Sequence, residues 1–319
     1  MTTINSALAQ EIFLLNRFSS VEYFGELRDV WGQMLQHLEQ CLDEYLRNLP
    51  SNLRARPLPE QADIVWGERI LPNFRSTYRG LCTGYIGLTH GDFSNLGYAN
   101  GPTNDFKGQS DYSSTWMKDE DEIRFRTQLN TAVAMAGNIV STDGAFWRPL
   151  DLTTNYSPLD HGPIDATMVL PKYQVSKTVF IKSGDLVRIS GVYVPDVEFG
   201  CAEFLNAQYP DAPLATVVVR MVDLINPATQ QKYGEAPEFA AKTCTWHLIE
   251  SHPTDRIAEE IANPDPGGHR VMAGDPCPAT GYYFTPARLN SRAYFVKGTS
   301  MPSIDSPYGA TIWQWDSQQ

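Results

Sequence analysis

The sequence has no long hydrophobic run and comparatively few basic residues. Its 319 residues include no stretch of the roughly 20 apolar residues that a membrane-spanning helix needs. The first 17 residues lack the basic cluster and apolar core of a signal peptide, so we expect a cytoplasmic protein. Lysine and arginine number 25 against 37 aspartates and glutamates, a net charge of −12. This balance excludes a general nucleic-acid binder, because affinity for duplexes comes from basic side chains.

Recognisable catalytic and metal-binding motifs are also missing. There is no HExxH, HxxxH or CxxC spacing, no phosphate-binding glycine loop, no GxGxxG and no GxSxG elbow. The cysteines are odd in number and scattered, at Cys41, Cys82, Cys201, Cys244 and Cys277. We therefore expect reduced, mostly buried thiols, no metal, no cofactor and no catalytic residues.

The N-terminal half has helical periodicity. Apolar residues recur every three or four positions over residues 19–50, and helices are also expected over 62–90 and 118–135. The second of these carries Gly80, Gly84 and Gly87, which indicate a broken or tightly packed helix. Residues 94–115 are rich in Gly, Asn, Ser and Asp, which predicts a long solvent-facing loop.

The C-terminal half has the texture of β-structure. Short β-branched or aromatic segments lie between turn residues, at 177–182, 186–190, 214–225, 242–250, 292–296 and 310–315. The sequence therefore predicts an α+β protein. It has a helical domain over residues 1–165 and a β-rich domain over 166–319, built from two related, small barrel-like units.

An internal repeat supports the two related units, at about 177–213 and 267–302. Both contain G-D-x4-[ST]-G-x-Y, first as Gly184, Asp185, Gly191 and Tyr193, then as Gly274, Asp275, Gly281 and Tyr283. We expect each Gly-Asp to form a tight turn in which glycine adopts a positive φ, and each tyrosine to face inward. Trp313 and Trp315 alternate onto one strand face, where we expect them to cover a core.

The C-terminal 50 residues resemble a known family. They contain R-x-x-x-G-D-x-C-P-x-[ST]-G-[YW] from Arg270 to Tyr282, K-G-x-x-M-P from Lys297 to Pro302, and G-x-T-I-W-Q-W from Gly309 to Trp315. This combination is similar to immunity proteins of the 71/72 type, which are encoded beside polymorphic toxins such as Rhs and other type VI secretion effectors of bacterial competition. The resemblance implies a cytoplasmic antitoxin that binds and neutralises a cognate effector, with no catalytic residues.

The acidic charge fits such a partner, because nuclease toxins tend to be basic and opposite charges speed association. We expect the toxin-binding surface to use acidic and aromatic side chains in two segments. These are Asp105, Asp111, Tyr112, Trp116, Asp119, Glu120, Asp121 and Glu122 in the first, and Asp196, Glu198 and Phe199 in the second.

Two alternatives remain open. A hydrolase could use loop histidines beside carboxylates, at His90 and Asp92 or between Asp160, His161 and Asp165. A carbohydrate-binding protein could stack sugars on exposed aromatic side chains of residues 94–115 or on Trp313 and Trp315.

Overall fold

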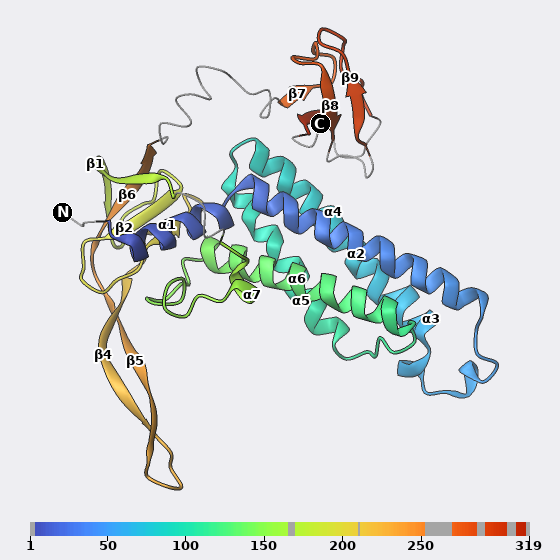
Figure 1. Cartoon of the computed structure of the whole chain (residues 1–319), viewed down its shortest axis with the longest axis horizontal. Helices are drawn as coiled ribbons and strands as arrows, with labels where there is room; N and C mark the ends of the chain where they lie inside the picture. The colour runs from blue at the N-terminus through green and yellow to red at the C-terminus, as the bar shows by residue number, and fades with distance from the viewer. Residues whose placement is uncertain are drawn as a thin grey trace. The chain divides into compact units, whose positions relative to one another are not determined.

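The computed structural model describes residues 4–164, 170–209, 211–252, 270–285, 291–304 and 311–316. Asp165 and Gly309, both singled out above, lie outside these residues. The chain forms two compact units, Met1–His252 and Pro253–Gln319 (Figure 1). The expected boundary near residue 165 separates helices from strands, and it lies within the first unit.

Helices occupy the first 161 residues. They are α1 (Ser6–Phe18), α2 (Val21–Arg47), η1 (Leu53–Ala55), η2 (Leu58–Glu60), α3 (Ala62–Val65), the π-helix η3 (Trp66–Ile70), α4 (Leu71–Thr89), η4 (Phe93–Ala99), α5 (Asn100–Gln109), α6 (Asp119–Asp143) and α7 (Pro158–His161). Ser20 caps α2 by accepting a hydrogen bond from the Tyr23 amide at 3.1 Å. The helices predicted over 19–50 and 118–135 are α2 and α6, and α6 continues eight residues further than predicted.

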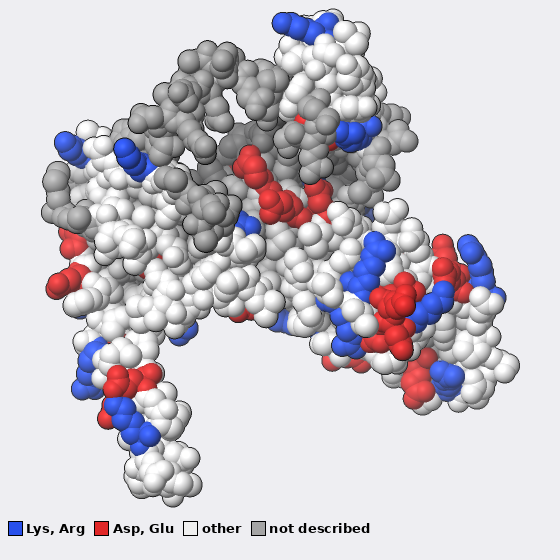
Figure 2. Space-filling model, viewed as in Figure 1, with Lys and Arg blue, Asp and Glu red and all other residues white. Residues whose placement is uncertain are grey.

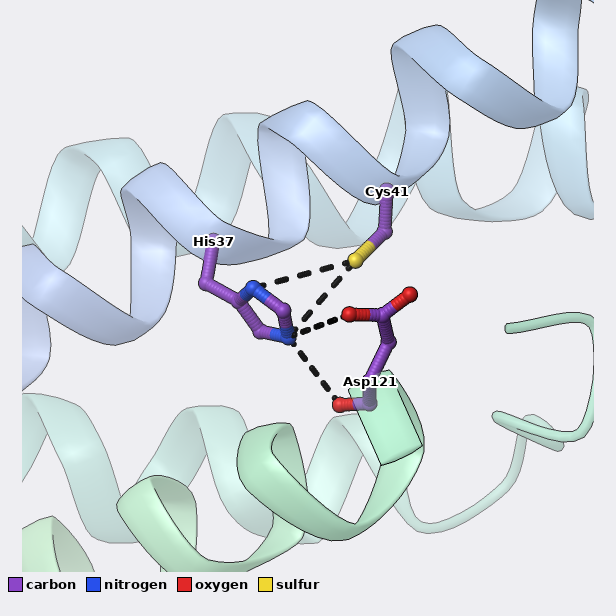
Figure 3. A group of neighbouring side chains, drawn as sticks. All are labelled: His37, Cys41 and Asp121. Carbon is purple, nitrogen blue, oxygen red and sulfur yellow. Dashed lines mark hydrogen bonds and ion pairs between the residues drawn. The ribbon is translucent and has the colours of Figure 1, made fainter. Parts of the chain in front are cut away.

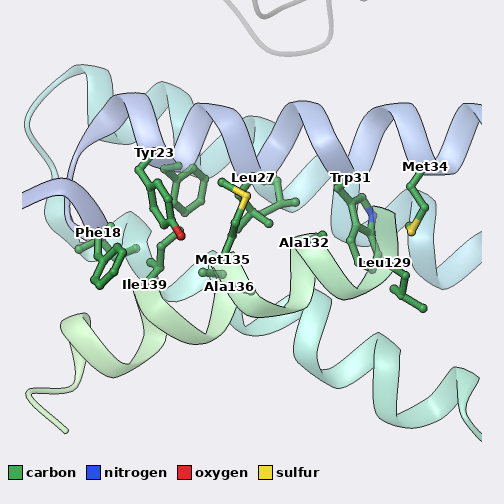
Figure 4. Packing of buried hydrophobic residues seen from close by; sticks show 14 of the residues in the cluster. Phe18, Tyr23, Leu27, Trp31, Met34, Leu129, Ala132, Met135, Ala136 and Ile139 are labelled. Carbon is green, nitrogen blue, oxygen red and sulfur yellow. The ribbon is translucent and has the colours of Figure 1, made fainter. Parts of the chain in front are cut away.

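The long helix α2 packs against α6 and α4 through its apolar stripe (Figure 4). Trp31 is fully buried in this core, and its indole nitrogen donates to the Phe74 carbonyl oxygen of α4 at 3.0 Å. A buried indole N–H without a partner would cost free energy, so this bond keeps the large side chain compatible with the core. The amphipathic pattern and the packing therefore agree.

The expectation of a long loop at 94–115 is wrong for most of that segment. Residues 93–109 form η4 and α5, and Leu96 and Ala99 are buried against α4 and α6. The Asp92 carboxylate starts η4 by accepting from the Ser94 amide at 3.0 Å. The segment contains too few apolar residues to show a helical period, so composition alone misassigned it.

The first sheet belongs to the same compact unit as the helices. Its strands are β1 (Lys172–Lys182), β2 (Gly191–Pro195), β3 (Glu203–Leu205) and β6 (Thr245–His252), all antiparallel in the order β1-β6-β2-β3. Val192, Val194 and Phe204 join the helical core on one face. Tyr193, Leu205 and Trp246 form a separate buried cluster on the other. Helices and first sheet thus share one continuous core.

A two-stranded ribbon, β4 (Ala215–Ile225) and β5 (Lys232–Lys242), lies in the chain between β3 and β6. Its strands pair with each other over their whole length, and the ribbon extends away from the first sheet in Figure 1. Within the described residues, its one other β-bridge joins Gly200 to Val217 near the base.

The second unit contains a sheet with the strand order of the first. Its strands β7 (Arg270–Met272), β8 (Gly281–Phe284), β9 (Ala293–Phe295) and β10 (Ile312–Trp315) are arranged β7-β10-β8-β9. The two turn glycines have similar positive φ values, 88° at Gly184 and 94° at Gly274. Equivalent main-chain bonds close both turns: Gly184 N to Ala212 O at 2.8 Å and Gly274 N to Met301 O at 2.8 Å, then Ala212 N to Asp185 O at 2.8 Å and Met301 N to Asp275 O at 2.9 Å.

Side chains of the two sheets match in the same way. Tyr193 and Tyr283 are both fully buried, and each phenol donates to the carbonyl oxygen four residues earlier, at 2.8 Å and 2.9 Å. The indoles of Trp246 and Trp313 each donate at 2.8 Å to a proline carbonyl oxygen, that of Pro213 or Pro302. The two sheets that contain the predicted repeats therefore share strand order, turns and buried hydrogen bonds. Each sheet also includes a strand beyond the predicted bounds of 177–213 and 267–302, namely β6 in the first and β10 in the second.

The architecture is α+β, with helices followed by antiparallel sheets, as the sequence predicts. Neither four-stranded sheet closes within the described residues, so the barrel-like part of that prediction is not confirmed. Residues 186–190 form no strand, and Leu186 makes a single bridge to Asp211. No helix in the described part of the chain has the length and apolar character needed to cross a membrane.

A glycine substitution tests the packing of α4. A Cβ atom at Gly84 would lie 2.9 Å from Phe24 Cζ and 3.1 Å from the Asn95 carbonyl oxygen, so Gly84→Ala should lower the free energy of unfolding by about 1–3 kcal/mol. Gly137→Ala in α6 meets nothing within 4 Å and should be neutral or stabilising by up to about 1 kcal/mol. Urea unfolding of both variants measures this, and equal effects would contradict the close approach.

Candidate functional site

The aromatic residues of the first expected interface segment are part of the helical core. Tyr112 and Trp116 are half-buried against it. The Trp116 ring lies 5.4 Å from both the Tyr45 and the Trp66 rings. These two side chains therefore fix the α5–α6 connection in place, and little of either is left for a partner.

The acidic residues of this segment divide into two groups. Asp111, Asp119 and Glu120 are exposed, whereas Asp105 is half-buried and burial raises its pKa. Glu122 accepts a hydrogen bond from the Ser114 hydroxyl and forms an ion pair with Arg126 at 2.7 Å, and both lower its pKa. On the face shown in Figure 2, acidic and basic side chains are interspersed at the α3 end of the helical region.

Further ion pairs join Lys118 to Glu44, Arg54 to Asp63 and Arg75 to Glu39. The net negative charge is thus not gathered into one uniformly acidic patch on that face.

The second expected segment, 196–199, is a loop after β2. The Asp196 carboxylate accepts from the Thr245 amide at 2.8 Å, so this residue holds the loop against β6. Glu198 and Phe199 are exposed, and Phe199 is 68% accessible with a φ of 60°. A left-handed backbone at a large exposed phenylalanine is uncommon and strained. The Phe199 carbonyl oxygen accepts from the Val218 amide at 3.2 Å, which ties the loop to the base of the β4–β5 ribbon.

A groove of about 1340 Å³ lies beside this loop. It is lined by α1, β1, the 194–200 segment and the base of β4, with Glu11, Phe180, Phe199 and His247 among its side chains. Small-molecule pockets usually measure about 300–1,000 Å³, so this groove is large enough for a segment of another protein.

The β4–β5 ribbon exposes large apolar side chains beyond the groove. Met221 is 50% accessible and Tyr233 is 70% accessible, and Val219 and Ile225 are also exposed. The ribbon also carries ion pairs, such as Arg220 with Glu238 at 2.5 Å and Lys232 with Asp223 at 2.7 Å. We call the 196–199 loop, the groove and the ribbon together the ribbon face.

Two neighbouring carboxyl groups have perturbed pKa values: Glu11, which is half-buried and lines the groove, and Glu203, which is buried. Burial raises the pKa of Glu11 to about 7, although the Ala202 amide, which donates to its carboxylate at 3.1 Å, lowers it. Glu203 on β3 is almost fully buried, and its Oε2 atom has no hydrogen-bond partner. Burial and the neighbouring Glu11 raise its pKa well above the usual range. No sequence signal marked this pair, because residues 11 and 203 meet only through the packing of α1 on the first sheet.

A cluster of three polar side chains, His37, Cys41 and Asp121, lies between α2 and the start of α6 (Figure 3). His37 and Cys41 are both buried, one helical turn apart on α2, and Asp121 approaches them from the first turn of α6. The His37 Nε2 atom lies 3.0 Å from the Asp121 carbonyl oxygen, 3.7 Å from Asp121 Oδ1 and 3.6 Å from Cys41 Sγ. Asp121 thus faces His37, although we expected it in a toxin interface. A histidine four residues before a cysteine on a helix is the sequence signal that could have drawn attention to this cluster.

Comparison with known proteins identifies no relative. No family model, curated protein or solved structure matches this chain.

The loop histidines have structural partners. His90 follows α4 as its C-cap, and Asp92 caps η4. His161 Nδ1 accepts from the Ser157 amide at 3.0 Å, and the His161 ring stacks on Tyr156. Burial lowers the pKa of His161. These contacts give Asp92 and His161 structural roles, whereas the exposed His90 bonds through its backbone amide, and Asp165 lies outside the described residues.

The tryptophans near the C-terminus face the core of their own sheet. Trp313 is buried, and Trp315 packs edge-on against Tyr283 with ring centroids 5.2 Å apart. This is the arrangement expected for a core-covering strand, and it leaves Trp313 unable to stack on a sugar.

Glutamine substitutions of the buried carboxyls should change the pH dependence of stability. The folded-state pKa of Glu11 is about 7 against an unfolded value of about 4.5, so the folded state binds more protons between these values. The contribution of Glu11 to stability is therefore fully present below about pH 4.5 and is lost as the pH rises to about 7. Glu11→Gln removes this loss and should gain about 2–3 kcal/mol relative to wild type between pH 5 and pH 8.

Urea unfolding at pH 5 and pH 8 measures this gain. The stability gain of Glu203→Gln should likewise be larger at pH 8 than at pH 5. Glu198→Gln, which changes an exposed carboxyl group on the same groove, is the matched control. A Glu11→Gln gain that is the same at both pH values would contradict the buried-carboxyl explanation.

Proposed function

We propose that this protein is an immunity protein, an antitoxin that neutralises a cognate secreted antibacterial effector by direct binding. The observation that carries the proposal is the ribbon face: a protruding two-stranded ribbon with exposed Met and Tyr side chains, beside a large groove. The C-terminal resemblance to immunity proteins supports the same function. No enzymatic turnover is required for it.

The physical argument begins with the ribbon itself. An isolated two-stranded hairpin is marginally stable in water, and exposed strand edges invite pairing with another chain. Here β4 and β5 pair with each other, and several of their large apolar side chains are accessible. Met and Tyr are enriched where proteins bind one another. A partner that covers these side chains would stabilise the ribbon while being bound by it.

The partner's chemistry is proposed from charge. A net charge of −12 favours a basic protein, such as a nuclease toxin acting in the cytoplasm, because opposite charges raise the association rate. The exposed carboxylates Asp119 and Glu120 at the start of α6 are candidates for this steering. Basic side chains lie among the acidic ones near the start of α6, so the electrostatic attraction there is moderate. We therefore propose that it speeds association, while the apolar side chains of the ribbon supply most of the affinity. Delivery of the toxin through type VI secretion, as an Rhs effector, follows from the resemblance alone.

One observation favours the alternative of a hydrolase. Glu11 lines the groove and has a pKa raised to about 7, which suits a general acid or base. Its test is a turnover assay, because Glu11→Gln would abolish hydrolysis of any substrate that binds in the groove and depends on this carboxyl group. The carbohydrate-binding alternative loses Trp313, which is buried, as its stacking surface.

Affinity capture tests the main proposal. The tagged full-length chain, expressed in its native bacterium, should recover one basic effector domain in near-stoichiometric amount, and co-expression should protect cells from that domain. Recovery of no toxin, together with hydrolysis of a substrate by the purified chain, would overturn the antitoxin proposal and support the hydrolase.

Charge substitutions on the ribbon should weaken the complex. Met221→Lys combined with Tyr233→Lys should raise the Kd for the captured effector on the order of 100-fold, since two interface side chains of this kind contribute a few kcal/mol together. The matched control is Leu159→Lys on α7, an apolar residue that is 88% accessible and lies off the ribbon face. Calorimetry with all three proteins measures this, and equal losses in both variants would remove the ribbon from the interface.

Charge reversal of Asp119 and Glu120 should lower the rate at which the protein associates with its effector. Lysine at both positions should slow association several-fold at low salt and have little effect near 1 M salt, where the Debye length falls to about 3 Å. Stopped-flow mixing at several salt concentrations measures this. An unchanged association rate at low salt would exclude this end of α6 from steering.

A further inference from the structure

We propose that His37, Cys41 and Asp121 together bind a divalent transition-metal ion, Zn²⁺ in particular, between α2 and the start of α6. The three side chains offer one nitrogen, one sulfur and one oxygen ligand atom, all within 4.8 Å of one another (Figure 3). The described ranges contain no other group of three such residues. The inference is independent of the proposed toxin binding.

The distances fit a tetrahedral ion. Zinc bonds measure about 2.0–2.3 Å, which places neighbouring ligand atoms about 3.3–3.6 Å apart. His37 Nε2 lies 3.6 Å from Cys41 Sγ and 3.7 Å from Asp121 Oδ1. Two of the three ligand pairs are therefore close to tetrahedral spacing. The third pair, Cys41 Sγ and the Asp121 carboxylate, lies within 4.8 Å, so rotation of the partly exposed Asp121 side chain would complete three bonds and leave the fourth position to water.

The donor set selects the metal class. Calcium and magnesium prefer oxygen ligands alone, whereas a thiolate with an imidazole and a carboxylate suits zinc. On binding, the Cys41 thiol loses its proton to solvent and the metal–sulfur bond takes its place. His37 Nε2, which donates to the Asp121 carbonyl oxygen in the metal-free geometry, gives its lone pair to the metal in the tautomer protonated on Nδ1.

The fold holds the ligands in place without the metal. The spacing of four residues puts His37 and Cys41 on one face of α2, and both are buried where α6 packs on that helix. Asp121 comes from the first turn of α6 and is about one-third exposed, so an ion can enter past it. A bound ion would join the two longest helices of the bundle and stabilise their packing.

The experiment uses the purified full-length chain, stripped with a chelator that is then removed. Added Zn²⁺ alone should bind at one ion per chain and raise the thermal midpoint. Added Co²⁺ should give the visible absorption of a tetrahedral site together with a sulfur-to-cobalt charge-transfer band. Absence of stoichiometric uptake, or of the charge-transfer band, would overturn the proposal.

Variants separate this site from adventitious binding. Cys41→Ser and His37→Gln should each weaken Zn²⁺ binding on the order of 100-fold or more, since loss of an outer-shell partner alone costs 10- to 100-fold. The matched control is Cys82→Ser, another buried cysteine, on α4, which should leave binding unchanged.

A second pair of variants covers the case in which a core substitution prevents folding. Asp121→Asn changes a partly exposed side chain, so the variant should fold. It should bind Zn²⁺ more weakly and lose the rise in thermal midpoint on zinc addition. Asp119→Asn, two residues earlier, should bind Zn²⁺ as the wild type does. Equal zinc affinity in Asp121→Asn, Asp119→Asn and wild type would overturn the proposal.

Discussion

Burial of strand β2 on both faces is the constraint on which the first unit depends. Val192 and Val194 pack into the helical core, while Tyr193 between them is fully buried in the opposite cluster with Trp246. A strand covered on both sides cannot leave the helices without exposing two cores to water, so helices and first sheet form one compact unit. The same packing brings Glu203 and Glu11 into a water-poor environment, where the charged form of a carboxyl group is disfavoured.

The two four-stranded sheets share the same set of internal hydrogen bonds, although helices cover only the first of them within its compact unit. Each frame is held by a positive-φ glycine turn, a buried tyrosine bonded to the chain four residues earlier, and a tryptophan bonded to a proline carbonyl oxygen. All of these contacts are internal to a sheet and its loops. The residues that differ are those on the outer faces, such as Val192 and Val194, which the helices cover in the first unit. The shared frame is what duplication of one small β unit, the interpretation of the sequence repeat, predicts.

The features that bear on function lie at the margins of this rigid core. The ribbon leaves the chain between β3 and β6, and its base is tied to the loop that carries the exposed Phe199. Apolar side chains on a ribbon that packs on little else are suited to capture another protein, which is the behaviour we propose for an antitoxin. The His37–Cys41–Asp121 cluster, by contrast, lies between the two long helices α2 and α6, away from the exposed ribbon. A metal there would stabilise the scaffold without entering the interface.

The sequence by itself determined the elements whose signals are local. The period of apolar residues in α2, the acidic first turn of α6 and the repeated Gly-Asp turns each depend on neighbours a few positions away, so they could be predicted, as could the α+β class. Only the tertiary structure decided which distant residues meet. It turned residues 93–109 into helices, because burial of Leu96 and Ala99 outweighs a composition typical of loops. It also packed Trp116 against Tyr45 and Trp66, turned Asp121 toward His37 and placed Glu11 near Glu203. Such contacts arise from packing between elements far apart in the chain, and no spacing along a single sequence records them.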